Sequence, residues 1–273
     1  MEELDQVVNS LKNNKSPGWD GLSAEFYKHF WSDIKEIIFK CFEESVVNQR
    51  LSPSQRIGII TLLPKPKPPT ELVHLKNWRP ITLLNVDYKI FTHIIKNRII
   101  QAIPHLVSKV QTGFQAGKCT SDNLILLCLT LENFHNNENE GGILLQVDFE
   151  RAFDSVEHQF LFKTLERMGF GENIIGMVKT AFHGCLSYVN VNGYLSHPVY
   201  LGRGLHQGSP LSPILFLLIS QVFTKKLEIN ENIIGMRVSG IDILLSLYAD
   251  DTDIFLSATA TSLEAVLGEL RAF

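Results

Sequence analysis

The sequence contains few cysteines and no long hydrophobic run. Its four cysteines are scattered along the chain, at Cys41, Cys119, Cys128 and Cys185. None forms a Cys-x-x-Cys pair or has a histidine at a spacing that suits zinc, so we interpret them as free thiols. The longest apolar run, residues 214–219, is far shorter than the ~20 residues that span a bilayer. The N-terminus also lacks the features of a secretion signal. We therefore expect an intracellular protein, nuclear or cytoplasmic, that is neither secreted nor membrane-bound.

Charge of one sign is not in large excess, since the net charge is -4, but it is unevenly distributed. Between Leu51 and Lys118 the chain carries ten basic and two acidic side chains, a net charge of +8, and the rest of the chain carries -12. A basic segment beside an acidic remainder suits a protein that holds both a polyanion and metal ions. An ordinary uneven surface has the same composition, so charge alone does not decide between them.

The spacing of apolar residues predicts an α+β protein. Helical spacing predicts helices over residues 26–42, 86–103, 124–134, 155–168 and 210–227, and a last one from about residue 262. Short apolar runs predict strands at residues 142–147, 243–248 and 254–256. Residues 188–191 and 198–201 flank Asn192-Gly193 and predict a hairpin with a tight turn. The proline-rich stretch at residues 64–69 predicts an exposed, extended, basic loop.

Three aspartates stand at the ends of the predicted strands. Asp148 follows the strand at residues 142–147, and Asp250 and Asp251 lie between the strands at 243–248 and 254–256. If these strands are neighbours, three carboxylates meet at one edge of a sheet. Crowded carboxylates repel one another unless cations match them, and Mg²⁺ prefers such oxygen ligands. The alternative is that Asp250-Asp251 is a polar turn and Asp148 a helix cap.

Six short blocks resemble the motifs of one enzyme family, in order and in rough spacing. Asp148-Phe-Glu-Arg-Ala-Phe-Asp-Ser-Val156, Gln207-Gly-Ser-Pro-Leu-Ser-Pro213 and Tyr248-Ala-Asp-Asp251 look like the palm motifs of reverse transcriptases. Upstream, Ser16-Pro-Gly-Trp-Asp-Gly-Leu22, Leu75-Lys-Asn-Trp-Arg-Pro-Ile-Thr-Leu-Leu84 and Gln111-Thr-Gly-Phe114 look like the fingers motifs of LINE-type enzymes. Over residues 10 to 270 the chain therefore resembles the reverse transcriptases of non-LTR (LINE-type) retrotransposons.

This resemblance implies a polymerase right-hand fold of the α+β class. Residues 1–140 would form the fingers region, and residues 141–273 a palm whose antiparallel sheet is backed by helices. The implied activity is RNA-directed DNA polymerase, with two Mg²⁺ ions (or Mn²⁺ in their place) as cofactors. The implied partners are an RNA template, a DNA primer and dNTPs, with no membrane. The resemblance also implies that the chain stops before the thumb, and whether a partner chain supplies that part is left open.

The matching positions imply roles for individual residues. Asp148 and Asp250 would be the principal metal ligands, with Asp251 as the third catalytic acid. Phe153 matches the steric gate that favours dNTPs, although a core aromatic is the alternative. The other predicted nucleotide contacts are Gln207, Gly208, Arg79 and Lys65, of which Lys65 could equally be a solvated surface charge.

A second set of positions would contact template or primer. These are Gln111, Gly113, Phe114 and Arg203, and for Arg203 a surface arginine is the alternative. Asp154 is interpreted as a cap of the helix that starts at Ser155. His206 departs from the family pattern, because an arginine commonly stands there, and Asp253 adds a fourth acid near the pair.

Three functions fit the sequence. The first is an RNA-directed DNA polymerase, and the second is a catalytically inactive, transposon-derived RNA-binding fold. The third, a viral RNA-dependent RNA polymerase, is disfavoured by Phe153 at the gate position and by Tyr-Ala-Asp-Asp where Gly-Asp-Asp would be expected. A preference for dNTPs over NTPs separates the first from the third.

Overall fold

The computed structural model describes residues 1–115, 117–136, 141–238 and 240–273, and these form two compact units. Unit 1 consists of residues Met1–Gln101 and Phe153–Ser212, and unit 2 of Ala102–Ala152 and Pro213–Phe273. Each unit is thus built from two separate stretches of chain, whereas the prediction divides the chain once, at residue 140. No helix among the described residues is both long and apolar enough to span a bilayer.

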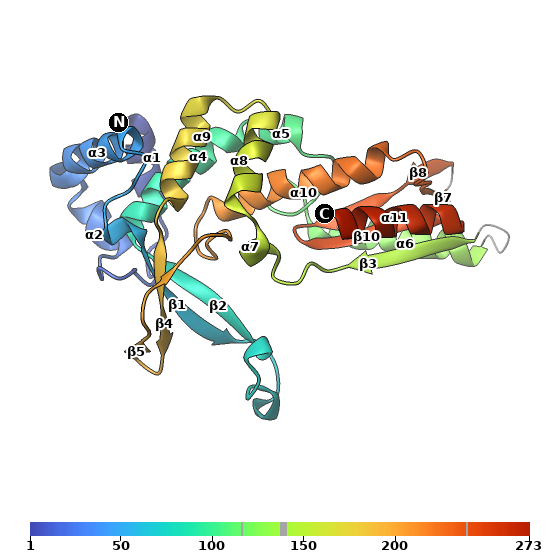
Figure 1. Cartoon of the computed structure of the whole chain (residues 1–273), viewed down its shortest axis with the longest axis horizontal. Helices are drawn as coiled ribbons and strands as arrows, with labels where there is room; N and C mark the ends of the chain where they lie inside the picture. Colours follow the sequence, from blue (N-terminus) through green and yellow to red (C-terminus); the bar gives the residue numbers. More distant parts are fainter. Residues whose placement is uncertain (116, 137–140, 239) are drawn as a thin grey trace. The chain divides into compact units, whose positions relative to one another are not determined.

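Unit 1 is mostly helical. Its helices are α1 (Glu2–Ser10), α2 (Ala24–His29), α3 (Trp31–Val47), α4 (Val86–Ile100), α8 (His158–Arg167) and α9 (Glu172–Phe182). The isoleucines that recur at helical spacing along α4 are buried, with Ile90, Ile95 and Ile99 all 0% exposed. Burial of such a side chain stabilises the fold by roughly 1.5–3 kcal/mol. The core of unit 1 therefore forms around α4, the helix that directly follows the strand carrying Arg79 (Figure 1).

The sheet of unit 1 has β1 (Ile57–Pro64) between an antiparallel and a parallel neighbour. It pairs antiparallel with β2 (Trp78–Leu84) and parallel with β4 (Leu186–Val191). The short strands β5 (Tyr194–Leu195) and β6 (Val199–Tyr200) both pair antiparallel with β4. The turn residues Asn192 and Gly193 have φ of 53° and 86°, as a primed turn requires, so the predicted tight turn is confirmed. The strand that pairs directly across this turn is β5, whereas the strand predicted at residues 198–201 is the shorter β6 and pairs with the start of β4.

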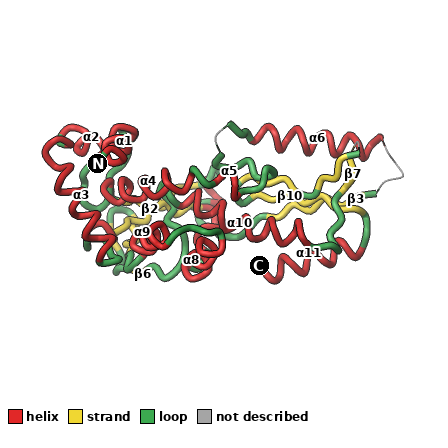
Figure 2. Tube along the Cα trace, turned by 90° about the horizontal axis from the view of Figure 1, so that it is seen from above, coloured by secondary structure: helices red, strands yellow, loops and turns green. Residues whose placement is uncertain are grey.

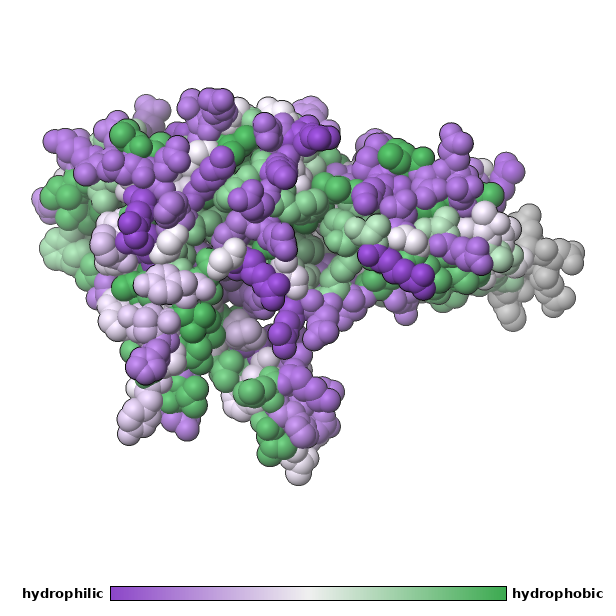
Figure 3. Space-filling view, viewed as in Figure 1, coloured by the Kyte–Doolittle hydropathy of each residue, from purple (hydrophilic) through white to green (hydrophobic). Residues whose placement is uncertain are grey.

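The connection between β1 and β2 contains the predicted proline-rich loop. Its short 3-10 turns are η2 (Pro69–Glu71) and η3 (Leu75–Asn77), and another, η1 (Ser54–Arg56), precedes β1. Val73 and Leu75 in this connection are 75% and 78% exposed. Figure 3 shows hydrophobic surface at the tip formed by this connection. The loop is exposed as predicted, but it is not uniformly polar.

Unit 2 contains the three strands that flank the aspartates. They are β3 (Gly142–Val147), β9 (Leu245–Tyr248) and β10 (Asp251–Ser257), in the order β3-β10-β9 with antiparallel pairing throughout. The predicted strands are thus neighbours in one sheet. A separate hairpin consists of β7 (Met236–Val238) and β8 (Ile241–Ile243).

Helices cover both faces of this sheet, because its strands alternate two sets of apolar side chains. Besides the short α5 (Ile103–Leu106), the helices of unit 2 are α6 (Thr120–Asn136), α10 (Ser212–Ile229) and α11 (Ala260–Ala272). On one face Ile254 packs with Phe223 of α10 and Val266 of α11. On the other face Phe255 packs with Leu127 of α6. Figure 2 accordingly shows α6 and α11 on opposite sides of β10.

The helix predicted over residues 155–168 is interrupted. The chain forms the short helix α7 (Ala152–Ser155), leaves helical geometry, and resumes as α8 at His158. The carbonyl of Phe153 accepts a hydrogen bond from the N–H of Leu205 (2.8 Å), and that of Val156 accepts one from Gly204 (2.7 Å). These carbonyls pair with a distant segment, which replaces the i to i+4 pattern of a helix. The predicted end of α8 is confirmed, since Gly169 follows it with φ of +83°.

Candidate active site

The sheet of unit 2 brings the three aspartates to the same end. Asp148 directly follows β3, Asp250 lies in the turn between β9 and β10, and Asp251 begins β10. Thr252 pairs with Val147 in the antiparallel register of these strands. The next step of that register sets Asp148 beside Asp251. The prediction that the three carboxylates meet at one end of a sheet is therefore confirmed.

The charges of these acids act on one another. The pKa of Asp251 is raised, first by partial burial and then by the negative charges of Asp250, Asp148 and Asp253. No lysine or arginine in the described stretches forms an ion pair with any of these four acids. Neighbouring carboxylates without a basic partner match the hard oxygen ligands that Mg²⁺ prefers.

The acids are not closed into a ligand cage. Within the described ranges, no three His, Cys, Asp or Glu side chains are grouped closely enough to hold a metal ion by themselves. Mg²⁺ usually takes only one or two protein carboxylates and completes its coordination with water and substrate phosphates. The open arrangement therefore fits this ion through the chemistry and mutual repulsion of its donors.

A hollow of about 430 Å³ lies next to these acids. Asp148, Asp251 and Asp253 line it together with Tyr248, and Asn123 and Leu124 of α6 line it as well. Its walls thus combine carboxylates, an aromatic side chain and apolar groups. Carboxylates repel phosphate oxygens unless a bound cation lies between them, so this lining fits a cation-bound phosphate beside an apolar group rather than a free phosphate.

The predicted template and primer contacts of unit 2 differ in exposure. Phe114 is 47% exposed and has φ of 55°, so its ring is accessible, and its role stays a prediction. Gln111 is only 2% exposed, and its amide is hydrogen-bonded to the main chain of Ala249. A Cβ on Gly113 would lie 2.4 Å from the nitrogen of Ala249. Gln111 and Gly113 therefore lie inside the protein against the main chain of Ala249, and their contact with template or primer stays a prediction.

In unit 1, the predicted nucleotide contacts lie along β2. The N–H of Thr82 donates to the carbonyl of Gln207 (2.8 Å). Gly208 has φ of +130°, and a Cβ there would lie 2.3 Å from the carbonyl oxygen of Thr82. Only glycine permits such a close approach of two main chains. Thr82 and Gln207, which lie 125 positions apart in the sequence, are thus fixed to one another by their main chains.

The two basic side chains of this group lie at the far end of the same hairpin. Arg79 is exposed on β2, where it pairs with Leu63 of β1. Lys65 directly follows β1 and is half-buried, and its N–H donates to the carbonyl of Asn77 (2.9 Å). Arg79 is therefore held on a paired strand, whereas Lys65 lies at the start of the connecting loop and is bound to it by one main-chain hydrogen bond.

Asp154 has a partner that the sequence does not indicate. The Nε2 of Gln207 donates to both carboxylate oxygens of Asp154, at 3.1 and 3.2 Å. Asp154 lies inside α7 and the next helix starts at His158, so the prediction that it caps a helix starting at Ser155 is wrong. The carboxylate fixes which end of the Gln207 amide faces it, because a carboxylate only accepts. The partner is 53 residues away, and no local pattern could have revealed it.

The remaining predicted residues of unit 1 are placed as follows. The Phe153 side chain is half-buried, and its carbonyl is bound by Leu205 as described above. Arg203 is exposed and forms an isolated antiparallel bridge with Glu157. Neither position decides between the functional role and its alternative, so both roles stay predictions.

His206, which departs from the family pattern, is a core residue. It is 6% exposed, and its Nδ1 lies 2.9 Å from the hydroxyl of Tyr88. Burial, and after it the nearby charge of His158, lowers the pKa of His206 to about 4. The imidazole at this position is therefore neutral near neutral pH. Its hydrogen bond to Tyr88 holds the residue directly before Gln207 and Gly208 in place.

Comparison with known proteins identifies the family to which the chain belongs. The family model described as "Reverse transcriptase (RNA-dependent DNA polymerase)" matches residues 63–273. The chain is 33% identical over 251 residues to the "Transposon TX1 uncharacterized 149 kDa protein" of Xenopus laevis, covering 92% of this chain and 19% of that protein. It is 26% identical over 264 residues to the "RNA-directed DNA polymerase from mobile element jockey" of Drosophila funebris, covering 95% and 27%.

A third relative is the "Retrovirus-related Pol polyprotein from type-2 retrotransposable element R2DM" of Drosophila melanogaster, 26% identical over 277 residues. That match covers 100% of this chain and 25% of the relative. The chain thus spans between 19% and 27% of the length of these three relatives. The resemblance to reverse transcriptases of non-LTR retrotransposons is confirmed, and the chain belongs to the reverse transcriptase (RNA-dependent DNA polymerase) family.

Proposed function

We propose that this chain is the fingers-and-palm part of an RNA-directed DNA polymerase of a non-LTR retrotransposon. The observation that carries the proposal is the set of aspartates at one end of the β3-β10-β9 sheet, which repel one another and have no basic partner among the described residues. Membership of the family supports the reaction class, and relatives whose names state RNA-directed DNA polymerase support the direction of synthesis. In this proposal unit 2 supplies the palm, and the sheet of unit 1 supplies the fingers.

Asp148, Asp250 and Asp251 would hold two divalent ions, Mg²⁺ or, in its place, Mn²⁺. When bound, such ions activate the primer 3′-hydroxyl and stabilise the charge on the leaving pyrophosphate. The raised pKa of Asp251 fits this role, because a carboxylate that is destabilised by its neighbours gains most from a bound cation. The chain itself contributes the fixed positions of these carboxylates.

Arg79, assisted by Lys65, would bind the triphosphate of the incoming nucleotide. A planar guanidinium binds phosphate oxygens in pairs, and both side chains extend from the paired β1–β2 hairpin. Gln207 and Gly208 would contact the nucleotide and the template base, and Phe153 would exclude a ribose 2′-hydroxyl. Substitution of Phe153 by Val should therefore raise the use of NTPs relative to dNTPs while leaving use of dNTPs largely intact.

The RNA template and DNA primer would be bound mainly through their phosphates. The segment from Leu51 to Lys118 has a net charge of +8, and phosphate contacts release counterions on binding. Affinity for an RNA–DNA duplex should therefore fall steeply between roughly 50 and 200 mM salt. An affinity that does not change over this range would contradict the assignment of the basic segment.

Primer extension on an RNA template, with dNTPs and Mg²⁺ or Mn²⁺, tests the proposal. The chain is compared with its Asp250→Ala/Asp251→Ala variant and with Asp242→Ala, a matched control that removes an exposed acid of β8 in the same unit. We expect extension that the double variant abolishes and the control retains. A parallel series carries, after Phe273, the following segment of a full-length relative.

The outcomes separate the possible causes of failure. Extension only in the fused series would mean that the acids are competent and that the added segment is needed to hold the duplex. Extension that survives the double substitution would contradict the role of the acids. Absence of extension in both series, with folded protein, would overturn the catalytic proposal and leave an RNA-binding fold.

A further inference from the structure

The buried side chain of Gln111 is bound to the turn that carries the catalytic acids. Its Oε1 accepts hydrogen bonds from the N–H groups of Ala249 (2.9 Å) and Gly113 (2.8 Å). Its Nε2 donates to the carbonyl of Ala249 (3.2 Å). One amide thus binds both polar groups of Ala249, the residue immediately before Asp250, across 138 positions of sequence.

Ala249 needs such a partner because of its backbone conformation. It has φ of 58°, in the left-handed region that a residue with a Cβ rarely adopts. It is also 6% exposed, so water does not readily reach its N–H and carbonyl groups. Buried main-chain groups that lack partners are strongly unfavourable. Gln111 both satisfies these groups and makes the left-handed conformation the favoured one.

The residues around Gln111 hold the same turn from its other side. The N–H and the hydroxyl of Thr112 both donate to the carbonyl of Leu247, at 2.9 and 3.1 Å. The Nδ2 of Asn123 donates to the same carbonyl (3.0 Å). Gly113 lies so close to Ala249 that no larger residue fits without a shift of the main chain. The segment from Gln111 to Gly113 therefore fixes the end of β9 directly before the acids.

We propose that Gln111 is a positioning residue that sets the geometry of Asp250 and Asp251 by holding Ala249 in the left-handed conformation. This inference rests on the proposed function of those acids. Gln111 does not line the hollow beside Asp251, and its side-chain hydrogen bonds go to the main chain of Ala249 and Gly113, so it acts through the main chain of the turn. Rotation about the Ala249 backbone would move the Asp250 side chain relative to Asp251 and Asp148. Small shifts of reacting groups lower the rate of turnover more than they weaken the binding of substrate.

The experiment compares three substitutions in the intact chain. Gln111→Met keeps the approximate volume and removes all three hydrogen bonds. Gln111→Glu keeps an acceptor for the two N–H groups and removes the donor. Ala249→Gly removes the steric cost of the left-handed conformation, because glycine adopts it freely. The double variant Gln111→Met/Ala249→Gly tests whether the two residues act through the same turn.

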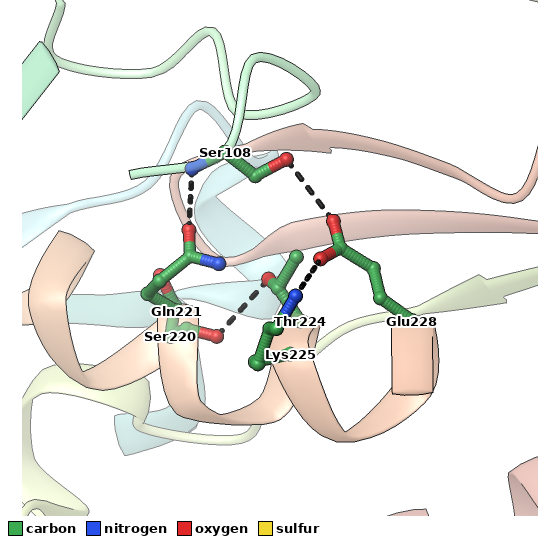
Figure 4. A network of polar contacts seen from close by, with 6 residues as sticks. All are labelled: Ser108, Ser220, Gln221, Thr224, Lys225 and Glu228. Carbon is green, nitrogen blue, oxygen red and sulfur yellow. Dashed lines mark hydrogen bonds and ion pairs between the residues drawn. The ribbon is translucent and has the colours of Figure 1, made fainter. Parts of the chain in front are cut away.

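Gln221 provides a matched control in the same unit. It is 8% exposed, and its Oε1 accepts from the N–H of Ser108 (2.6 Å), whose hydroxyl donates to Glu228 (3.1 Å) (Figure 4). Gln221→Met therefore also removes a buried glutamine that binds the main chain of the 107–113 segment, but it leaves the contacts of Ala249 in place. A general loss of packing in unit 2 would affect both variants alike.

Two measurements are made on each variant. Hydrogen exchange resolved to the amide of residue 249 reports the turn itself and needs no catalytic activity. We expect Gln111→Met to speed this exchange about tenfold or more, and Gln221→Met to leave it unchanged. In primer extension we expect Gln111→Met to lower kcat about tenfold or more while leaving the KM for dNTP nearly unchanged. Gln111→Glu should give a smaller loss, and Ala249→Gly should restore part of kcat in the double variant.

The two readouts distinguish failure of this inference from failure of the proposed function. If the wild-type chain extends no primer but Gln111→Met still exchanges faster than wild type at residue 249, the positioning of the turn is supported and the proposed reaction is contradicted. Extension by Gln111→Met with wild-type kcat would overturn the inference, as would unchanged exchange at residue 249. Equal effects of Gln111→Met and Gln221→Met on both readouts would overturn it too. If Gln111→Met fails to fold, Gln111→Glu with and without Ala249→Gly gives the same comparison.

Discussion

His206 should make the stability of the chain depend on pH in a defined window. Its imidazole is 6% exposed, and burial, followed by the charge of His158, lowers its pKa from 6.5 to about 4. In the unfolded chain the group is in water and binds its proton at the ordinary value. Between these two pKa values the unfolded state therefore binds more protons than the folded state. Stability from this group is complete above the unfolded pKa and is lost as the pH falls from 6.5 toward about 4.

The size of the effect follows from the difference between the two pKa values. At 1.36 kcal/mol for each unit, a fall in pH from above 6.5 to below about 4 removes ~3 kcal/mol of the free energy of unfolding. At about pH 5 the loss is ~2 kcal/mol relative to neutral pH. This is a large part of the 5–15 kcal/mol that stabilises a typical domain, so denaturation with urea can resolve it.

The assay measures the free energy of unfolding near neutral pH and at about pH 5 for the wild type, His206→Gln and Tyr88→Phe. Every other titrating group contributes equally to the three proteins, so the differences isolate His206. Glutamine can still accept a hydrogen bond from Tyr88 but does not titrate, so this variant should lose ~2 kcal/mol less than the wild type on acidification. Tyr88→Phe removes the hydroxyl and keeps His206 buried, so it should keep the pH dependence of the wild type. The same pH dependence in His206→Gln and in the wild type would refute the reasoning.

Three further predictions concern the core and the nucleotide site. Asp154→Ala removes the charged acceptor that orients the Gln207 amide, a hydrogen bond that contributes ~1.5 kcal/mol. The KM for dNTP in primer extension should therefore rise about tenfold, with a smaller change in kcat. A lowered kcat at constant KM would contradict this role. Gly208→Ala forces a Cβ to within 2.3 Å of the Thr82 carbonyl, so the Tm should fall. A variant that keeps the wild-type Tm would show that the two segments are not packed in this way. Leu161→Ala leaves a cavity at a fully buried position and should cost about 2–5 kcal/mol in urea denaturation, and a loss well below this would mean that the site collapses around it.

Several elements of both units could be predicted because local sequence patterns determine them. Strand β3 has the bounds predicted from an apolar run that ends at an acid. The turn at Asn192-Gly193 was predicted because few residues tolerate its left-handed backbone. The long helices α4 and α10 follow from apolar spacing alone. In each case the residues that determine the structure are adjacent in the sequence or lie within a few turns of one helix.

The features that could not be predicted depend on partners far away in the chain. The interruption between α7 and α8 occurs because Gly204 and Leu205 bind the carbonyls of Val156 and Phe153. The close contact between these two segments also places the Gln207 amide against Asp154, so that acid does not cap the following helix. The composition of residues 152–168 contains no breaker, so helical spacing predicts one continuous helix there. The packing of residues 204–205 against this stretch overrides its preference for a continuous helix.

The turn that carries Asp250 and Asp251 depends on both kinds of information. The sequence Tyr-Ala-Asp-Asp identifies the acids, but it does not by itself stabilise a left-handed Ala249, since an isolated alanine favours other conformations. That conformation is stabilised by an amide 138 residues upstream, in a block that sequence reasoning assigned to template binding. The geometry of the acids is therefore a property of the pair of blocks, and transfer of the four-residue motif without its glutamine partner should not reproduce it. In this proposal Gln111 and Gly113 belong with the palm motif in function, although they lie before β3 in the chain. Ala249→Gly should therefore weaken the dependence on Gln111.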